Sequence, residues 1–408
     1  MDPVSVSIID PVVIVGAGIV GLTIGQALKK RGIRFEIYER DATPTARGQG
    51  WAITLHWALE YMIQILPPET LARIQSTQVD PCVARKDNGN FMFINLENGE
   101  PKWKIPPSVR WRVNREKMRL ALLEGIEEHV HWDRQVVGID ILENGAQLAF
   151  ADQSVAKGRL IIGADGSRSM VRQVLRPDAY LNTPVGVNFT GVAVDLIPEK
   201  VKALRDMDPL LFQGCHPPTG AFFWYSTLET PQVNGTAGTS AERYRAQICM
   251  SWPVRGPEDQ VASTDAERLA NMKRRAQGFA PFLKQAVDDI PAGTAVTEIK
   301  LADWECLPWD NRQGRITLVG DSSHAMTMYR GEAANHGLLD AFHLVDAIAN
   351  IYSGDATPQQ AIDGFEEEMR TRTSRAVRLS RTACLDAHDW TRLDESSAIL
   401  TKRAIQGK

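Results

Sequence analysis

"PVVIVGAGIVGLTIGQALKKRGIRFEIYERD" (residues 11–41) is a strand, a glycine turn, a helix and a second strand in succession. Residues 12–15 form a continuous apolar run, which is typical of a parallel strand buried on both faces. Apolar residues at helical spacing follow the glycines, and Gly32 ends this helix before the second strand begins. Such a unit predicts the beginning of a doubly wound α/β fold.

The glycines of this unit are Gly16, Gly18 and Gly21, in GxGxxG spacing. In a dinucleotide-binding turn the first allows a tight turn, the second lets backbone approach a pyrophosphate, and the third allows close helix–strand packing. Glu39 ends the second strand, where a carboxylate binds ribose hydroxyls and favours FAD or NAD over NADP. The alternative is a structural glycine turn with a surface glutamate.

Two more strand ends repeat this theme. "GADGSRSMVR" (163–172) places Asp165 after a buried strand, and "RITLVGD" (315–321) ends in Asp321. Small and polar residues then fill the chain as far as the next long helix. Each turn alone is also compatible with an ordinary strand–helix connection. Together they predict a flat, negatively charged ligand across the N-terminus of that helix.

The chain alternates between two kinds of pattern. Strand–helix units at both ends flank a β-rich middle, so we predict a doubly wound, Rossmann-like α/β domain interrupted by a β-sheet-rich substrate domain, with a C-terminal helix. The predicted boundaries are 1–80, 108–182 and 296–350 for the first domain, 81–107 and 183–295 for the second, and 351–408 for the C-terminal segment.

Local periodicity predicts individual elements as well. Helices are expected over 55–66, 113–126, 264–277, 280–289 and 357–387. Strands are expected through most of 183–255, as a hairpin over 136–152, and over 295–307.

Composition excludes several classes of protein. The 408 residues carry a net charge of −4 with a pI near 6.1, so no basic field indicates nucleic acid as a partner. Five widely spaced cysteines indicate reduced thiols, and no His, Cys, Asp or Glu spacing indicates a metal site. No signal peptide and no apolar run of spanning length is evident, so we expect a cytoplasmic protein without a membrane span.

The three motifs in this order resemble the group A flavoprotein monooxygenases, the para-hydroxybenzoate hydroxylase-like family. The segment "RGEAANHGLLDA" (330–341) is most similar to fungal members that act on natural products. The resemblance covers most of residues 10–350. It implies one tightly bound, non-covalent FAD.

The resemblance also implies roles for individual residues. Gly16, Gly18 and Gly21 would hold the FAD pyrophosphate, Glu39 the adenosine ribose and Asp321 the ribitol chain, with Asp165 in the second flavin motif. Ala52 and Ala334 would present backbone to the cofactor, and Arg115 would reach the flavin side as a charged donor. Tyr225 matches a tyrosine that often lines the substrate pocket and is the candidate catalytic residue. A core aromatic in a strand is the alternative for Tyr225.

Some positions depart from the family pattern. Relatives have proline soon after the third motif, where this chain has Ala325 to Tyr329, and they tend to have glycine at the position of Ala333. Several fungal relatives carry a catalytic arginine on the first strand after the second motif, but the nearest positions here are Val194 and Asp195. His336 is interpreted as a packing or hydrogen-bonding residue.

The function implied is that of a FAD-dependent monooxygenase. It would use NADPH or NADH and O2 to hydroxylate or epoxidise a small aromatic, polyketide or alkaloid-type natural product through a flavin C4a-hydroperoxide. Because the departures lie near the expected flavin, two alternatives stay open: a flavoprotein oxidase, or a redox-neutral flavin-dependent cyclase or isomerase. A non-enzymatic flavin-binding subunit is a third.

Overall fold

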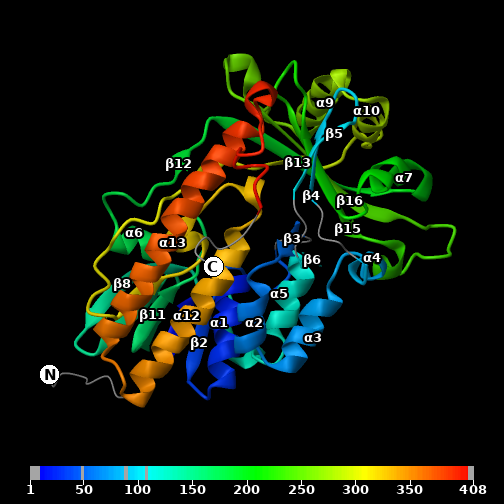
Figure 1. Cartoon of the computed structure of the whole chain (residues 1–408). Helices are drawn as coiled ribbons and strands as arrows, with labels where there is room; N and C mark the ends of the chain where they lie inside the picture. The colour runs from blue at the N-terminus through cyan, green and yellow to red at the C-terminus, as the bar shows by residue number, and fades with distance from the viewer. Residues whose placement is uncertain (1–9, 47–49, 87–90, 106–108, 403–408) are drawn as a thin grey trace.

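The computed structural model describes residues 10–46, 50–86, 91–105 and 109–402. Two large sheets organise the chain, and Figure 1 shows helices gathered around the lower one and a broad sheet above it. The predicted mixed α/β fold with a sheet-rich second part and a C-terminal helix is confirmed. The domain boundaries given above stay a prediction.

The lower sheet is parallel and has five strands in the order β19-β11-β1-β2-β7. Its central strand β1 is buried along its whole length, which explains the continuous apolar run at residues 12–15. The strands are β1 (Val12–Val15), β2 (Phe35–Tyr38), β7 (Val130–His131), β11 (Leu160–Gly163) and β19 (Ile316–Leu318).

Helices cover this parallel sheet. α1 contacts α5 and α12, and the 29-residue α13 packs along α12, as the orange and red ribbons of Figure 1 show. Their bounds are α1 (Ile19–Lys30), α2 (Leu59–Ile65), α3 (Pro68–Ser76), α5 (Arg115–Leu123), α12 (Ala333–Ser353) and α13 (Pro358–Asp386). Shorter helices are α4 (Pro81–Ala84), α6 (Met170–Leu175), α8 (Pro231–Asn234) and α11 (Asp321–His324).

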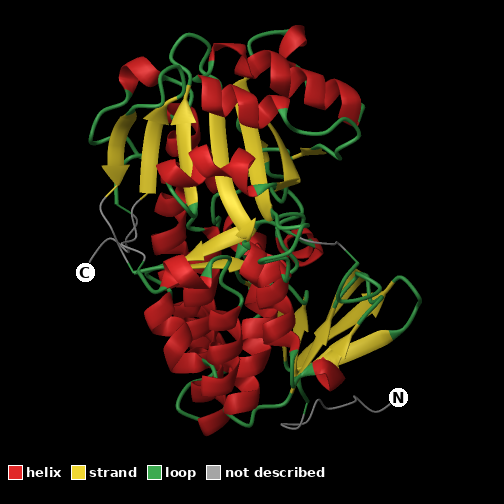
Figure 2. Ribbon diagram, turned by 90° about the vertical axis from the view of Figure 1, so that its right-hand side faces the viewer, coloured by secondary structure: helices red, strands yellow, loops and turns green. Residues whose placement is uncertain are grey.

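The upper sheet has seven strands in the order β17-β13-β16-β15-β14-β4-β5, all antiparallel except the β14–β4 pair. Its strands are β4 (Phe91–Asn95), β5 (Pro101–Ile105), β13 (Val187–Leu196), β14 (Leu211–Cys215), β15 (Phe222–Glu229), β16 (Tyr244–Pro253) and β17 (Thr297–Glu298). Helices on one side of it share an apolar core with the sheet, namely α7 (Pro198–Met207), α9 (Asp265–Arg275) and α10 (Pro281–Asp288). Figure 2 shows this sheet above the helices of the parallel layer.

A two-stranded ribbon lies between the two layers. β3 (Ala52–Leu55) pairs antiparallel with β6 (Trp111–Asn114) and contacts both α12 and β15. Smaller sheets complete the fold: β8 (Val136–Leu142), β9 (Gly145–Phe150) and β10 (Val155–Gly158) form one, and β12 (Thr183–Pro184) with β18 (Ala302–Asp303) forms another. Within the described residues no helix has the length and apolar character that a membrane span requires.

Three local predictions were wrong. The helix expected over 55–66 begins only at Leu59, because Leu55 still belongs to a strand that pairs with distant residues. The strand expected over 295–307 is reduced to two short pieces, since β17 pairs with β13 and β18 with β12. α7 lies in a stretch expected to be β-rich, although Pro198 at its first turn and buried Val201 and Leu204 are helix signals.

Candidate functional site

The predicted cofactor residues gather at one edge of the parallel sheet. Gly16, Glu39, Asp165 and Asp321 each follow a strand of that sheet, and all of these strands run in the same direction. Their carboxyl ends therefore meet along one edge. Ligands of open α/β sheets bind at this edge, near the point where the strand order reverses.

The glycine turn has the geometry that its sequence predicts. Gly16 has φ +108°, and a Cβ there would lie 2.5 Å from the backbone oxygen of Ala164. A Cβ on Gly21 would lie 2.1 Å from the oxygen of Gly16, so only glycine lets the helix pack this closely. A Cβ on Gly18 would meet nothing within 4 Å. The turn thus has two glycines required by packing and one that faces open space at a helix N-terminus.

Glu39 is buried against this turn. Its carboxylate accepts hydrogen bonds from the backbone N–H of Ala17 at 2.8 Å and of Asp41 at 3.0 Å. The side chain of Arg119 donates to the carbonyl of Ala17 at 2.7 Å from the other side. A carboxylate is therefore fixed beside the glycines, at the position where a ribose would be bound.

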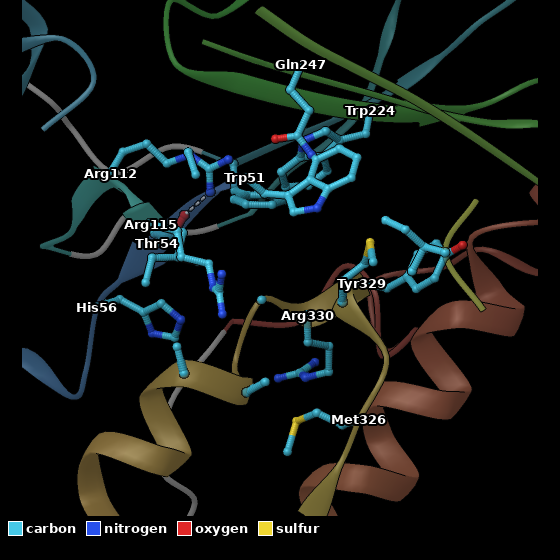
Figure 3. A pocket seen from close by; sticks show the side chains of 18 of the residues that line it. Trp51, Thr54, His56, Arg112, Arg115, Trp224, Gln247, Met326, Tyr329 and Arg330 are labelled. Atoms are coloured by element: carbon cyan, nitrogen blue, oxygen red, sulfur yellow. Dashed lines mark hydrogen bonds between the residues drawn. The ribbon is translucent and has the colours of Figure 1, made fainter. Parts of the chain in front are cut away.

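A cavity of about 360 Å³ lies between the ribbon of β3 and β6, the upper sheet and the start of α12. Ala52, Arg115, Asp321 and Ala334 all line it, although they come from four elements far apart in sequence. Figure 3 shows Arg115 and Arg330 directed into the space, with aromatic side chains above and beside them. The structure thus brings together four of the residues predicted to contact a cofactor.

Asp321 begins α11 and lines this cavity. Among the described residues no donor is hydrogen-bonded to its carboxylate. Burial raises the pKa of Asp321, while its electrostatic interactions with His324, Arg115 and Arg172 act in the opposite direction. A carboxylate with spare acceptor capacity at this edge is suited to bind hydroxyl groups of a ligand.

The segment that carries Asp321 is held from behind by Asp340 of α12. The Asp340 carboxylate accepts from the N–H of Gly320 at 2.8 Å, from Arg372 at 2.8 Å, and contacts His324 Nε2 at 2.6 Å. Burial opposes ionisation, but His324 and Arg372 together hold the pKa of Asp340 below its usual range. A buried ionic network therefore fixes the turn before Asp321.

His336 belongs to the edge of this network. Its Nδ1 lies 2.9 Å from Arg372 Nη1, and the arginine can only donate, so the imidazole nitrogen accepts. Burial and the charge of Arg372 lower the pKa of His336 well below its usual value. These contacts agree with its interpretation as a hydrogen-bonding residue.

Asp165 is at the expected sheet edge but points to its own helix. Its carboxylate accepts from the N–H of Met170 at 2.7 Å and of Val171 at 3.3 Å, at the start of α6. It does not line the cavity. In this structure the side chain of the second motif shapes the turn, and its contribution to cofactor binding stays a prediction.

Tyr225 does not fit the predicted catalytic role. Its side chain is fully buried in the apolar core that the upper sheet shares with α7, α9 and α10, where it stacks on Phe212 at 5.3 Å. Its hydroxyl contacts Thr227 at 3.2 Å, and burial raises its pKa to about 12. Successive residues of a strand point to opposite faces, so Phe222 and Trp224 line the cavity and Tyr225 faces away from it.

Several cavity residues were not predicted from the sequence. Arg110 and Arg112, which precede Arg115 in "RWRVNR", line the wall formed by β6. Residues two apart in an extended segment share a face, so the pattern Arg-Trp-Arg was the available signal. Aromatic residues supply much of the remaining wall: Trp51, Phe91, Phe189, Phe222, Trp224 and Tyr329. No group of three or more His, Cys, Asp or Glu suited to a metal ion occurs in the parts of the chain that are described.

Comparison with known proteins identifies the family. A model of the FAD binding domain matches residues 130–380, and a model of the NAD(P)-binding Rossmann-like domain matches residues 14–73. A probable FAD-dependent monooxygenase of Arthroderma benhamiae is 40% identical over 412 residues, covering 96% of this chain and 95% of the relative. This chain belongs to the FAD-dependent monooxygenase family. The monooxygenase dbaB of Emericella nidulans is 39% identical over 378 residues, covering 91% of this chain and 95% of its own.

Solved structures agree with this monooxygenase in fold. A putative FAD-containing monooxygenase from Photorhabdus luminescens superposes with a TM-score of 0.75 at 23% identity, covering 93% of this chain and 98% of that one. Klebsiella pneumoniae HpxO, complexed with FAD and uric acid, has a TM-score of 0.72 at 20% identity, covering 93% and 89%. At these identities the likeness concerns the fold.

The residues of the monooxygenase fit FAD on structural grounds. The open space at Gly18 and the helix N-terminus behind it suit a pyrophosphate, and the carboxylate of Glu39 is fixed beside them. Further along the same edge, Asp321 presents an acceptor to the cavity that Ala334 and Arg115 also line. Along the edge, Glu39 follows β2, the glycine turn follows β1 and Asp321 follows β19, which is the order of ribose, pyrophosphate and ribitol along FAD.

Replacing Asp321 by alanine tests this assignment. Loss of a charged acceptor for ribitol hydroxyls is worth about 1.5–3 kcal/mol, so FAD affinity should fall about ten- to a hundredfold. The FAD released from acid-precipitated protein, per mole of chain, measures occupancy and also checks that attachment is non-covalent. Glu305→Ala, which removes a partly exposed carboxylate paired with Arg378, is the matched control. Full occupancy in Asp321→Ala contradicts the assignment.

Proposed function

We propose that this FAD-dependent monooxygenase uses NADPH or NADH and O2 to oxygenate a small aromatic, polyketide or alkaloid-type natural product. The observation that supports this most directly is the cavity itself. One wall carries the residues expected to hold the flavin, including Asp321 and Ala334, and the facing wall is aromatic. A flat substrate packed against Trp224 would lie within the same cavity as the flavin ring.

The chain's own residues supply binding and shielding. FAD, when bound, supplies the redox and oxygen chemistry. Buried Phe189, Phe222 and Tyr329 keep the far side of the cavity apolar and exclude water from the reacting groups. Arg115, in the first turn of α5, would donate to the flavin, and Ala334, in the first turn of α12, would lie where the helix dipole favours negative charge on the ligand.

The departures noted in the sequence line this cavity as well. Met326, Met328, Tyr329 and Ala333 contribute to its wall, where relatives carry proline and glycine. Met side chains adapt to irregular shapes, so this segment would tune the fit of the substrate. We therefore infer that the altered segment determines which substrate is accepted and leaves oxygenation intact.

Isotope labelling tests the proposed reaction. Purified holoenzyme is supplied with NADPH or NADH and ¹⁸O2 and is screened against small aromatic, polyketide and alkaloid-type compounds. We expect nicotinamide oxidation that depends on substrate and one ¹⁸O atom in the product, with none incorporated from labelled water. Unlabelled product with hydrogen peroxide would indicate an oxidase. Product formed without O2 and without NAD(P)H would indicate a redox-neutral cyclase or isomerase.

A further inference from the structure

Arg112 is a buried cation in the cavity wall. Its side chain is only 5% exposed and extends from β6 toward β15. Nη1 donates to the hydroxyl of Thr54 at 2.9 Å and Nη2 to the hydroxyl of Ser226 at 2.7 Å. The guanidinium also lies 5.7 Å from the ring centre of Trp224. β3, β6 and β15 together therefore fix its position.

The protein does not balance this charge. Both hydrogen-bond partners of Arg112 are neutral hydroxyls, and its Nε has none. Within the described residues no carboxylate lies within ion-pair distance of it. Two of five N–H donors are used, so three remain. Burial and then the like charge of Arg110 lower the pKa of Arg112 to about 9, which leaves it protonated at neutral pH.

Other buried arginines near this region are treated differently. Arg330 pairs with Glu332 at 2.6 Å, and Arg372 pairs with Asp340 at 2.8 Å. Burying a charge without a partner costs several kcal/mol, so proteins rarely do it without a function. Arg112 also has Arg110 beside it in the same wall, which increases the positive potential there. Two arginines in an aromatic cavity form a site for an anion.

The position of this positive wall distinguishes it from the expected cofactor site. Arg112 is hydrogen-bonded to Ser226 of the upper sheet, and the same face of β15 presents Trp224 to the cavity. Figure 3 shows Arg112, Trp51, Trp224 and Gln247 around the upper part of the space, with Arg330 below. Gln247 adds a buried amide oxygen without a hydrogen-bond partner. Arg112 and Gln247 therefore lie on the side of the cavity where the substrate is expected.

We propose that the substrate is a flat aromatic compound with an ionised oxygen, either a carboxylate or an acidic phenolate, and that Arg112 and Arg110 bind this oxygen. The inference rests on the proposed function, because it names the substrate of that reaction. Trp51 and Trp224 would cover the ring, and the anion would complete the hydrogen bonding of Arg112. Charge-assisted hydrogen bonds are about twice as strong as neutral ones, so the enzyme would prefer an anionic substrate to a neutral one of the same shape.

Binding to the oxidised holoenzyme tests the proposal without turnover. Benzoate and benzamide have the same shape and differ in charge, and their binding is followed by the change in flavin absorbance and by calorimetry. A hydrogen bond to a charged group is worth about 1.5–3 kcal/mol, so benzoate should bind about ten- to a hundredfold more tightly. A comparison of 4-nitrophenolate with 4-nitroanisole shows whether a phenolate is accepted in the same way.

Two variants assign the preference to the residue. Arg112→Gln should bind benzamide as the wild type does, retain FAD, and lose the preference for benzoate. Arg112→Lys should keep part of the preference for benzoate, because lysine retains the positive charge but lacks the planar guanidinium that can bind a carboxylate with two hydrogen bonds. The wild type alone can overturn the proposal. It does so if it binds benzoate and benzamide equally and also binds 4-nitrophenolate and 4-nitroanisole equally, or if it binds none of these four compounds. Loss of FAD from Arg112→Gln also overturns it, since the arginine would then serve the cofactor.

These outcomes are independent of the labelling experiment. A preference for the anionic ligand, measured without NAD(P)H, can be found in an oxidase or a cyclase as well. If that preference is absent, the ¹⁸O2 experiment still decides whether the enzyme oxygenates its substrate. The inference is wrong if the natural substrate is neutral and binds Arg112→Gln and the wild type equally well, even if ¹⁸O appears in the product.

Discussion

Gly21→Ala is expected to leave the purified protein without FAD and less stable than the wild type. The new Cβ would lie 2.1 Å from the carbonyl oxygen of Gly16, a backbone atom that cannot rotate away. Overpacking costs about 1–3 kcal/mol in general, and a backbone clash at the cofactor turn belongs at the upper end. Thermal unfolding and the FAD content of the purified protein measure both effects.

Two other glycines serve as matched controls. Gly18→Ala should fold normally, since φ is −77° and its Cβ meets nothing within 4 Å, but the methyl group would intrude on the bound pyrophosphate. It should therefore lose FAD at unchanged stability of the apoprotein. Gly364→Ala, in an open position of α13, should gain about 0.5–1 kcal/mol from helix propensity and retain FAD. An occupied, stable Gly21→Ala protein would show that the turn is not built as described.

Asp340→Asn is expected to be the most destabilising single change of charge. It removes the buried carboxylate partner of Arg372, which keeps its bonds to the partly exposed Glu368 and to the imidazole of His336, and it weakens the contacts to His324 and Gly320. Breaking a buried ion pair by removing one partner costs about 3–5 kcal/mol. Because Gly320 precedes Asp321, FAD should also bind less tightly. Urea unfolding with and without added FAD separates the two effects.

Asp346→Asn is the control for this prediction. It lies on the same helix, but its side chain is 43% exposed and pairs with Arg31 at the surface. Surface ion pairs contribute about 0–1 kcal/mol, so its unfolding midpoint should barely change. If both variants behave alike, the network around Asp340 does not support the site.

The residues at the cofactor edge of the parallel sheet could be predicted from the sequence for a physical reason. Gly16, Glu39 and Asp321 stand directly after apolar strands, and parallel strands bring their carboxyl ends to one edge whatever the rest of the fold does. Local patterns therefore carried information on a site assembled from distant segments. Arg115 and Ala52 followed from the resemblance to the family, and both line the cavity.

The substrate side could not be predicted in this way. The first half of β15, "FFWY", is apolar on both faces, because one face meets the cavity and the other meets α9 and α10. Without alternation the sequence does not reveal which residues point where, and a shift of one position exchanges Trp224 for Tyr225. The ribbon that carries Arg112 depends on pairing between residues 52–55 and 111–114, a long-range contact that periodicity does not contain.

The division of β15 into two faces also bears on how this enzyme can diversify. Phe222 and Trp224 contact the ligand space, whereas Phe223 and Tyr225 belong to the core that stabilises the sheet. Substrate range and stability are thus encoded by alternating residues of one strand. Gene duplicates, or libraries made in the laboratory, can exchange Phe222 and Trp224 to accept new compounds while Phe223 and Tyr225 preserve the fold.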